Sequence, residues 1–244
     1  MQNRVFVAGA GGAIGRPLCR LLVGDGWQVT GTTRSPEKAG ALETLGIEPV
    51  VVDVFDADRL ERVVADAGPH IVVHQLTDLP PGLDPARMAD ALERNARIRE
   101  VGTRNLVAAA VAAGAERLIA QSIAFAYAPG SQPYVEDTPL NLDGPDRAGL
   151  TARGVASLER QVLEAPLYGI VLRYGRLYGP GTGFGHPPKG APLHVDAAAD
   201  AARRAMTRGR AGVYNIAEDD GTISIRKAAE ELGWDPGFRL ATGR

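Results

Sequence analysis

The sequence predicts an α/β protein with a doubly wound parallel sheet and a small C-terminal lobe. Three observations support this prediction. Short apolar runs alternate with segments of helical spacing up to residue 178, glycines follow the first run, and a Gly- and Pro-rich segment begins at Gly179. Apolar strands that alternate with helices are typical of a parallel sheet covered on both faces.

The expected strands are short runs rich in valine, isoleucine and threonine, bounded by glycine or polar residues. Before Gly179 these runs lie at residues 4–10, 27–33, 48–54, 70–76, 116–124 and 169–175. Apolar residues with helical spacing predict the intervening helices. These helices are expected at residues 13–26, 35–46, 56–68, 85–113 and 150–163.

Beyond residue 178 the pattern changes. The stretch GPGTGFGHPPKGAP has too many glycines and prolines for regular structure. A helix at 195–207, a strand at 212–217 and a helix at 224–233 are expected to follow it. We therefore expect a main domain over residues 1–178 and a small substrate-side lobe over residues 179–244. Residues 213–216 either stay in this lobe or rejoin the main sheet.

Bulk composition excludes several classes of protein. A formal net charge of −2 over 244 residues gives no field that would attract nucleic acid or an anionic membrane. Cys19 is the only cysteine, so no intrachain disulfide is possible, and the four histidines show no metal-ligand spacing. No apolar run approaches the ~20 residues that span a bilayer, and no signal-peptide pattern precedes the first strand. A cytoplasmic protein without a metal is expected.

The first strand-to-helix turn predicts a dinucleotide site. Gly9, Gly12 and Gly15 lie between the first strand and the first helix. In a Rossmann-like fold such glycines allow the tight turn, the close approach of a diphosphate and the packing of the helix on the sheet, while the helix N-terminus faces the anion. The alternative is a glycine-rich turn that binds nothing.

The end of the second strand favours NADP over NAD. An NAD site usually places a carboxylate about 20 residues beyond the glycines, where it bonds the ribose. Here that position reads GTTRSPEK, in which Arg34 could pair with a 2′-phosphate. An ordinary surface arginine is the alternative. Asp53, at the end of the third strand, either meets the adenine edge or caps a solvated turn.

Seven motifs in order resemble the extended short-chain dehydrogenase/reductase family, the NAD-dependent epimerase/dehydratases. GAGGAIG is similar to its GxxGxxG loop and VLRYGRLYGPGT to its LRxxNxYGPG segment. Further similar segments are HIVVHQL, VGTRNLVAAAVAAG, RLIAQSIAFAY, HVDAAADAA and VYNIAEDDGTISIRKAAEELG.

The resemblance implies positions for a bound cofactor and its reaction partner. It implies a diphosphate at Gly9, Gly12, Ala13, Ile14 and Gly15, adenine beside Asp53 and Val54, ribose near Gln75, Leu76 and Thr77, and nicotinamide along Tyr174 and Leu177. It also places Ser122 near the catalytic serine or threonine of the family.

The acid–base pair of the family is missing. The family carries Tyr-x-x-x-Lys on the helix before the sixth strand, and alignment on Glu159 places Thr151 and Val155 at these two positions. None of the six tyrosines has a lysine four residues later. A threonine hydroxyl is too weakly acidic to act as a general acid, although it can donate a hydrogen bond.

Other side chains are therefore candidates for protonating or orienting a substrate. Ser122, Thr151 and Tyr127 are the expected catalytic residues, with Tyr127 as the leading proton donor. The alternative for Tyr127 is a packed aromatic ring whose hydroxyl bonds the backbone. His186 is a further candidate, but it is expected to be mobile and exposed.

The sequence thus favours an atypical NADP-dependent oxidoreductase of the epimerase/dehydratase type. Its substrate would be a small organic carbonyl or hydroxyl compound, because only TGFGHPPKGAPL separates the YGPG and HVD motifs. Two alternatives stay open: a non-catalytic NADP-binding or sensing protein, and a non-redox lyase or cyclase. The stretch 128–149 either covers the cofactor with Tyr134 and Glu136 or forms a stiff surface loop.

A homodimer is also plausible from the resemblance, because in the family the helices corresponding to 85–113 and 150–163 pair across a two-fold axis. Val155, Leu158 and Val162 would then serve either that contact or the core of the monomer.

Overall fold

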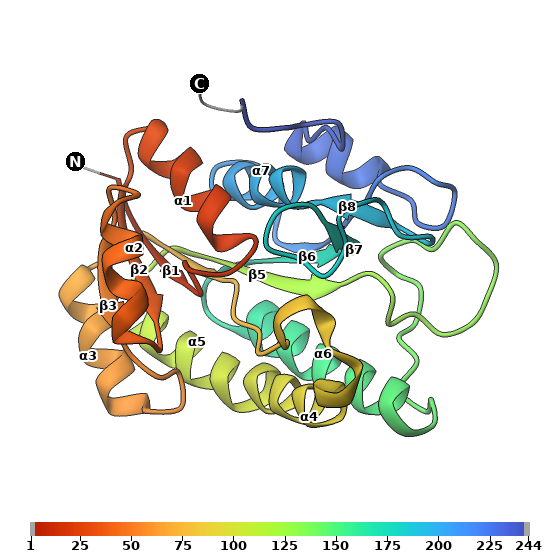
Figure 1. Ribbon diagram of the computed structural model, residues 1–244, viewed down its shortest axis with the longest axis horizontal. Coiled ribbons are helices and arrows are strands. Elements are labelled where there is room, and N and C mark those ends of the chain that lie inside the picture. The colour runs from red at the N-terminus through yellow and green to blue at the C-terminus, as the bar shows by residue number, and fades with distance from the viewer. Residues whose placement is uncertain (1–2, 242–244) are drawn as a thin grey trace.

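A seven-stranded parallel sheet forms the centre of the molecule in the computed structural model, which describes residues 3–241 (Figure 1). In spatial order the strands are β3 (Glu48–Val51), β2 (Gln28–Thr33), β1 (Arg4–Ala8), β4 (Ile71–His74), β5 (Arg117–Ile123), β6 (Tyr168–Tyr174) and β9 (Gly212–Ile216). All neighbouring strands are parallel. The doubly wound fold class expected from the sequence is confirmed.

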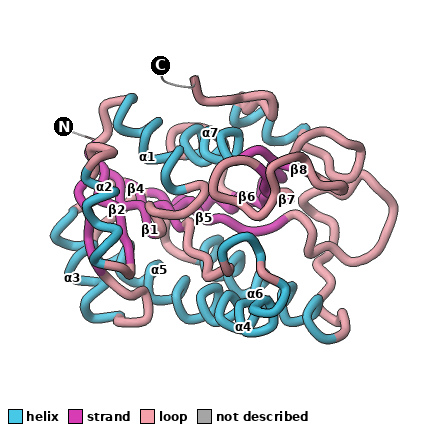
Figure 2. The backbone as a smooth tube through the Cα atoms, in the orientation of Figure 1, coloured by secondary structure: helices cyan, strands magenta, loops and turns pink. Residues whose placement is uncertain are grey.

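Helices cover both faces of this sheet (Figure 2). They are α1 (Gly15–Gly24), α2 (Ala39–Glu43), α3 (Ala57–Ala67), α4 (Met88–Arg97), α5 (Thr103–Ala112), α6 (Asp146–Glu164) and α7 (Val195–Ala205). Residues of α1, α2 and α7 join one apolar core, and residues of α3, α5 and α6 join the other. The chain order reverses between β1 and β4, so the carboxyl ends of these strands form the crevice where such sheets bind ligands.

The apolar face of α6 belongs to the monomer. Val155, Leu158 and Val162 are all buried within the single chain. Leu158 and Val162 pack in the core beneath β5 and β6, and Val155 packs with Ala126. Of the two roles left open by the sequence, these three side chains therefore serve the core.

The helix expected over 85–113 is interrupted. A 3₁₀ turn spans Pro85–Arg87, and a π-helical turn over Ile98–Gly102 separates α4 from α5. The Thr103 hydroxyl donates to the Ile98 carbonyl across this turn. Apolar periodicity could not have shown this interruption, because the backbone stays helical in direction through the wider turn.

The C-terminal part of the chain is tied to the same sheet. β9 pairs with β6 over five residue pairs, from Ile170–Gly212 to Tyr174–Ile216. A separate two-stranded parallel sheet, not expected from the sequence, joins β7 (Arg176–Tyr178) to β8 (Pro192–His194). Residues 179–191 form the loop between β7 and β8.

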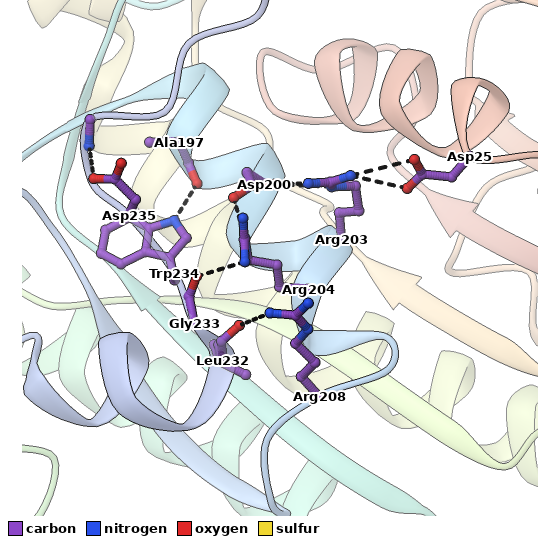
Figure 3. Close-up of polar contacts among 11 residues, drawn as sticks. Asp25, Ala197, Asp200, Arg203, Arg204, Arg208, Leu232, Gly233, Trp234 and Asp235 are labelled. Atoms are coloured by element: carbon purple, nitrogen blue, oxygen red, sulfur yellow. Dashed lines mark hydrogen bonds and ion pairs between the residues drawn. The ribbon is translucent and has the colours of Figure 1, made fainter.

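A buried ion-pair cluster joins α1, α7 and the C-terminal segment (Figure 3). The Asp200 carboxylate in α7 accepts hydrogen bonds from Arg203 and Arg204, each at 2.5 Å. Arg203 also reaches Asp25 beyond α1, and Arg204 donates to the Gly233 carbonyl. We call Asp200, Arg203 and Arg204 the scaffold cluster.

Candidate active site

The glycine turn between β1 and α1 is packed so closely that larger residues would not fit. Gly9 has a φ of +91°, and a Cβ there would lie 2.6 Å from the Gln75 carbonyl oxygen. A Cβ at Gly15 would lie 2.2 Å from the Gly9 carbonyl oxygen. The Gly9 amide donates to Thr32 Oγ1 at 3.0 Å, which ties the turn to β2. The turn is therefore held in one shape by β2 and β4.

The outer side of this turn can accept an anion. Gly12 is exposed, so its backbone can be approached closely. Helix α1 begins after Ile14 without a side-chain cap, so its first amides and its dipole are available to a negative ligand. The loop between β7 and β8 lies beside this place, since a Cβ at Gly181 would be 3.6 Å from Ala13. These features fit a diphosphate.

The end of β4 contains a buried carboxamide with one unused atom. Gln75 Nε2 donates to the Tyr174 hydroxyl at 3.3 Å, and that hydroxyl donates to the Ala198 carbonyl. Among the described residues, Gln75 Oε1 is buried without a hydrogen-bond partner. Burial raises the pKa of Tyr174, so its phenol stays neutral and structural.

The residues after Gln75 are positioned by a neutral histidine. Burial lowers the pKa of His74 to about 4, and its Nδ1 accepts the Leu76 amide. The Leu76 carbonyl accepts from Gln121 of β5, and Thr77 is exposed at the edge of the sheet. This segment lies against Gly9, since a Cβ there would also approach the Leu76 nitrogen to 3.2 Å.

The expected adenine side is formed by the end of β3. Val54 is buried, and its carbonyl accepts from Asn105 of α5 at 2.9 Å. Asp53 is exposed and accepts the Phe55 amide at 3.0 Å, as in the turn that the sequence left as an alternative. Both residues remain candidates for flanking a purine.

Arg34 at the end of β2 shares a carboxylate with a second arginine. Its guanidinium bonds Asp78 at 3.0 Å, and Arg94 of α4 bonds the other oxygen of Asp78 at 2.8 Å. We call Asp78, Arg34 and Arg94 the edge cluster. Partial burial raises the pKa of Asp78, but the bonds and charges of both arginines outweigh this and hold the pKa below its usual range. The cluster carries one excess positive charge.

Ser122 belongs to a buried ionic network on the other side of the site. Its hydroxyl donates to Glu159 of α6 at 2.8 Å. Glu159 receives two further bonds from Arg173 of β6, at 2.8 and 2.7 Å. The one proton of the Ser122 hydroxyl is thus committed to a carboxylate in this arrangement.

Tyr127 is held by the same network. Its buried hydroxyl donates to Asn215 of β9 at 2.5 Å and accepts from Arg173 at 2.9 Å. Burial raises the pKa of Tyr127, although Arg173 and Asn215 oppose this effect. Its ring stacks on Tyr134 with a centroid distance of 5.2 Å. These contacts are those of a packed aromatic whose hydroxyl is bonded inside the protein.

The positions of the missing acid–base pair lie on one face of α6. Val155 is 0% exposed and packs in a small apolar cluster with Ala126 and Ala152. Thr151 is half-buried one turn earlier, and within residues 3–241 its side chain makes no hydrogen bond. Of the three expected catalytic hydroxyls, Thr151 alone keeps its proton free for a ligand in this arrangement.

The remaining expected positions are spread along the same edge. Leu177 is half-buried in β7 and packs against the core that contains α1 and α7. Glu136 accepts the Asn215 amide at 2.9 Å, so the stretch 128–149 is fastened to β9. His186 is exposed in the loop between β7 and β8. In the described part of the chain, no group of three or more metal-ligating side chains is assembled.

Several contributors were not identified from the sequence. Asp78, in the loop after β4, bonds Arg34, and Arg94 of α4 bonds the same Asp78 carboxylate. Asn215 of β9 contacts Tyr127. Asp78 directly follows the expected ribose residues, so an acid next to Thr77 was the signal that could have suggested it. Asn215 carried no such signal, because its role depends on where β9 pairs.

The sequence of this chain is similar to those of a known enzyme family and of two reductases. The model of the NAD dependent epimerase/dehydratase family matches residues 5–195. A 3-diazoavenalumate denitrifying reductase from Streptomyces sp is 42% identical, over 89% of this chain and 76% of its own length. Human L-xylulose reductase is 39% identical over 28% of each chain.

Solved structures share the fold at low identity. UDP-glucose 4-epimerase of Thermotoga maritima, solved with UDP-glucose, has a TM-score of 0.78 at 19% identity and covers 97% of this chain and 94% of its own. The Bordetella bronchiseptica enzyme WbmH, solved with NAD+, has a TM-score of 0.72 at 22% identity and covers 91% and 77%. None of the helices formed by the described residues is long and apolar enough to cross a membrane.

Proposed function

This chain belongs to the NAD dependent epimerase/dehydratase family, and on that premise we propose that it is an NADPH-dependent reductase that removes dinitrogen from an aromatic diazo or diazonium compound. As an enzyme it is an NAD(P)-dependent oxidoreductase of this family. The relative that is 42% identical is named for the removal of nitrogen from a diazo compound.

One observation carries the proposal: the site has no proton donor where the family has one. Val155 occupies the lysine position and is wholly buried, and Thr151 occupies the tyrosine position. The hydroxyl protons of Ser122 and Tyr127 are donated to Glu159 and Asn215. The site therefore lacks a general acid for a reaction that must protonate a carbonyl oxygen.

Reduction of an arenediazonium ion needs no such proton. One hydride is taken up at the aryl carbon, a C–H bond forms, the C–N bond breaks, and the departing N₂ keeps the electron pair of that bond. The arene is the product, and charge is balanced by oxidation of the nicotinamide. The chemistry requires a hydride source and a positioned substrate, without a general acid.

The residues that would hold the dinucleotide are those of the β1, β2, β3 and β4 ends. The glycine turn with Ala13 and Ile14 would bind the diphosphate, and Asp53, Val54, Gln75, Leu76 and Thr77 would surround the adenosine. Arg34 would meet the 2′-phosphate, and Tyr174 and Leu177 would line the far end. When bound there, the nicotinamide supplies the hydride.

The protein side of the site then has a positioning role. Ser122 and Tyr127 keep the wall formed by β5, β6 and β9 rigid through Glu159, Arg173 and Asn215. Thr151 offers its hydroxyl to the substrate as a hydrogen-bond donor or acceptor. Catalysis would rest on orientation and on exclusion of water from a reactive electrophile.

A preference for NADP is part of the proposal. Arg34 is 52% exposed, and its pairing with Asp78 uses one of its bonds, so the guanidinium can still receive a phosphate. Arg94 adds a second positive charge at the same carboxylate. NAD would lack the group that these arginines recognise.

Carbonyl reduction is the second candidate, because the free Thr151 hydroxyl could bond a carbonyl oxygen. It would then have to take the proton from water, so we expect it to be much slower. A sensing role without turnover and a non-redox lyase or cyclase are the remaining alternatives.

The test is consumption of NADPH with a panel of arenediazonium salts, aldehydes and ketones. We expect consumption well above the protein-free rate with the diazonium salts only, with one arene and one N₂ formed per NADPH. Gly12→Val should abolish it by blocking the diphosphate, whereas Gly24→Ala, with no atom within 4 Å of the added Cβ, should not. A diazonium rate equal to that without protein would refute the proposal.

The proposal also covers the partners, the location and the oligomeric state of the enzyme. A small-molecule substrate fits the short β7–β8 loop, and we expect no nucleic acid or membrane partner and a cytoplasmic location. A homodimer formed through α6 would use its outer side, where Leu163 is exposed, because Val155, Leu158 and Val162 are buried in the monomer. Light scattering on the purified chain would show the mass.

A further inference from the structure

Arg176 is an arginine where the family motif has an asparagine. The motif LRxxNxYGPG aligns with LRYGRLYGPG, which places Arg176 at the motif asparagine. Arg176 is exposed at the start of β7, and its guanidinium carbon lies 4.8 Å from the centre of the Phe125 ring. Among the ion pairs of residues 3–241, none includes Arg176.

The backbone under this pair is fixed at the carboxyl edge of the sheet. Phe125 follows β5, two residues after Ile123. The Arg176 amide donates to the Ala191 carbonyl at 2.7 Å, and the Gly175 amide donates to the Ile216 carbonyl at 2.8 Å. The positive charge therefore lies at the same edge as Ser122 and Tyr127.

Exposed apolar side chains occur in the loops at the carboxyl edge of the sheet, where Phe125 and Arg176 lie. Eight large apolar side chains of the described residues are exposed. Five of them lie in the loops that follow β4, β5 and β7: Leu79, Phe125, Val135, Leu142 and Phe184. Apolar side chains are thus exposed in the loops at the edge where sheets of this kind bind ligands.

A second arginine–aromatic pair shows what a purely structural pair looks like here. Arg117 lies 4.4 Å from the Tyr168 ring at the opposite, amino-terminal edge of β5 and β6. Its guanidinium is anchored to the backbone, with Nη1 donating to the Ala205 and Arg208 carbonyls at 2.7 and 3.0 Å. Arg176 makes no such side-chain bonds to described residues.

We propose that Arg176 and Phe125 form the substrate subsite for the carboxylate of an aromatic acid. The carboxylate pairs with the guanidinium, which offers five N–H donors, and the aromatic body packs beside the exposed Phe125 ring. This inference deepens the proposed function and rests on it for the reaction, because it specifies which aromatic compounds are turned over.

The experiment compares the binding of an aromatic carboxylate with that of its uncharged amide analogue. Binding of cinnamate and of cinnamamide to the protein saturated with NADP+ is measured by calorimetry for the wild type, Arg176→Gln, Arg176→Lys and Arg226→Gln. Arg226 is the matched control, because it is an exposed arginine whose guanidinium is paired with Glu230 of its own helix and contacts no aromatic ring among the described residues.

We expect the wild type and Arg226→Gln to bind cinnamate about tenfold more tightly than cinnamamide, as one charge-assisted contact provides. Arg176→Gln should lose this preference by weakening only cinnamate, and Arg176→Lys should restore part of it. Phe125→Ala should weaken both compounds by similar factors. NADP+ affinity and melting temperature should be unchanged in all variants.

Three results would overturn the inference: no binding of either compound, equal binding of both to the wild type, or an acid preference that survives in Arg176→Gln. The outcome is separable from that of the proposed function. A lost preference in Arg176→Gln without any diazonium reduction supports the subsite and refutes the reaction, whereas diazonium reduction with equal binding does the reverse.

Discussion

Two clusters in this molecule have the same composition, one aspartate between two arginines, and differ in their surroundings. In the scaffold cluster Asp200 is 0% exposed, and Arg203 and Arg204 also bond Asp25 and the Gly233 carbonyl. In the edge cluster Asp78 is 24% exposed, and Arg34 and Arg94 are 52% and 45% exposed. Within each trio the aspartate makes two ion pairs, but the solvent exposure of the two trios differs.

The difference indicates what each cluster can do. Burying a carboxylate is costly, so the scaffold cluster is stable only while all of its partners stay in place, and it joins three segments of the chain. Exposed ion pairs contribute little and exchange easily with water or ligands. The edge cluster is therefore able to open and receive a phosphate, whereas the scaffold cluster is not.

The largest effect is expected at Asp200. Asp200→Asn would leave Arg203 and Arg204 beside a neutral group in a buried place, and we expect a loss of about 3–5 kcal/mol in the free energy of unfolding. Urea denaturation measures it. Asp25→Asn, which removes a partly exposed partner of Arg203, should cost at most about 1 kcal/mol. Equal losses for the two variants would contradict the distinction between the clusters.

A smaller effect, on cofactor binding, is expected at Arg34. Arg34→Gln should weaken NADPH about 10- to 100-fold by removing a charge-assisted phosphate contact, and should leave NADH unchanged. Calorimetry with both cofactors measures this difference. Asp78→Asn is the second variant. It removes the carboxylate that competes with the 2′-phosphate for Arg34, so NADPH should bind at least as tightly as to the wild type. Equal weakening of NADPH and NADH by Arg34→Gln would argue against 2′-phosphate recognition.

The smallest effect concerns acid stability at Asp78. Because its folded pKa lies below the unfolded value, Asp78 stabilises the fold above its ordinary pKa, and this contribution disappears as the pH falls through the folded pKa. For so exposed a group we expect at most about 1 kcal/mol. Unfolding curves from neutral pH down to pH ~3 should be flatter for Asp78→Asn than for the wild type. Parallel curves would mean that the two arginines do not bind Asp78 in solution.

The same contrast explains how much the sequence could predict. The alternating strands, the glycine turn and the missing Tyr/Lys pair follow from local pattern and spacing, and the sheet confirms the fold class. The partners of Arg34 and Tyr127 come from segments 44 and 88 residues away, so no local pattern could reveal them. Residue type indicated where charges lie along the chain but not whether a carboxylate would meet them.

The helix α6 gives a second example. Its apolar spacing correctly predicted a helix, but the same spacing suits a subunit contact or a core. Only the packing of Val155, Leu158 and Val162 beneath the sheet distinguishes the two. The π-helical turn before α5 was likewise not identified, because apolar spacing does not specify which backbone hydrogen bonds a helical segment makes.

The pairing of β9 with β6 has a consequence for motion. Because five residue pairs join β9 to the sheet that carries the glycine turn, β9 moves with that sheet. Motion that admits and releases ligands is then left to the loops at the carboxyl edge, and we expect their opening to set how fast spent cofactor and product leave.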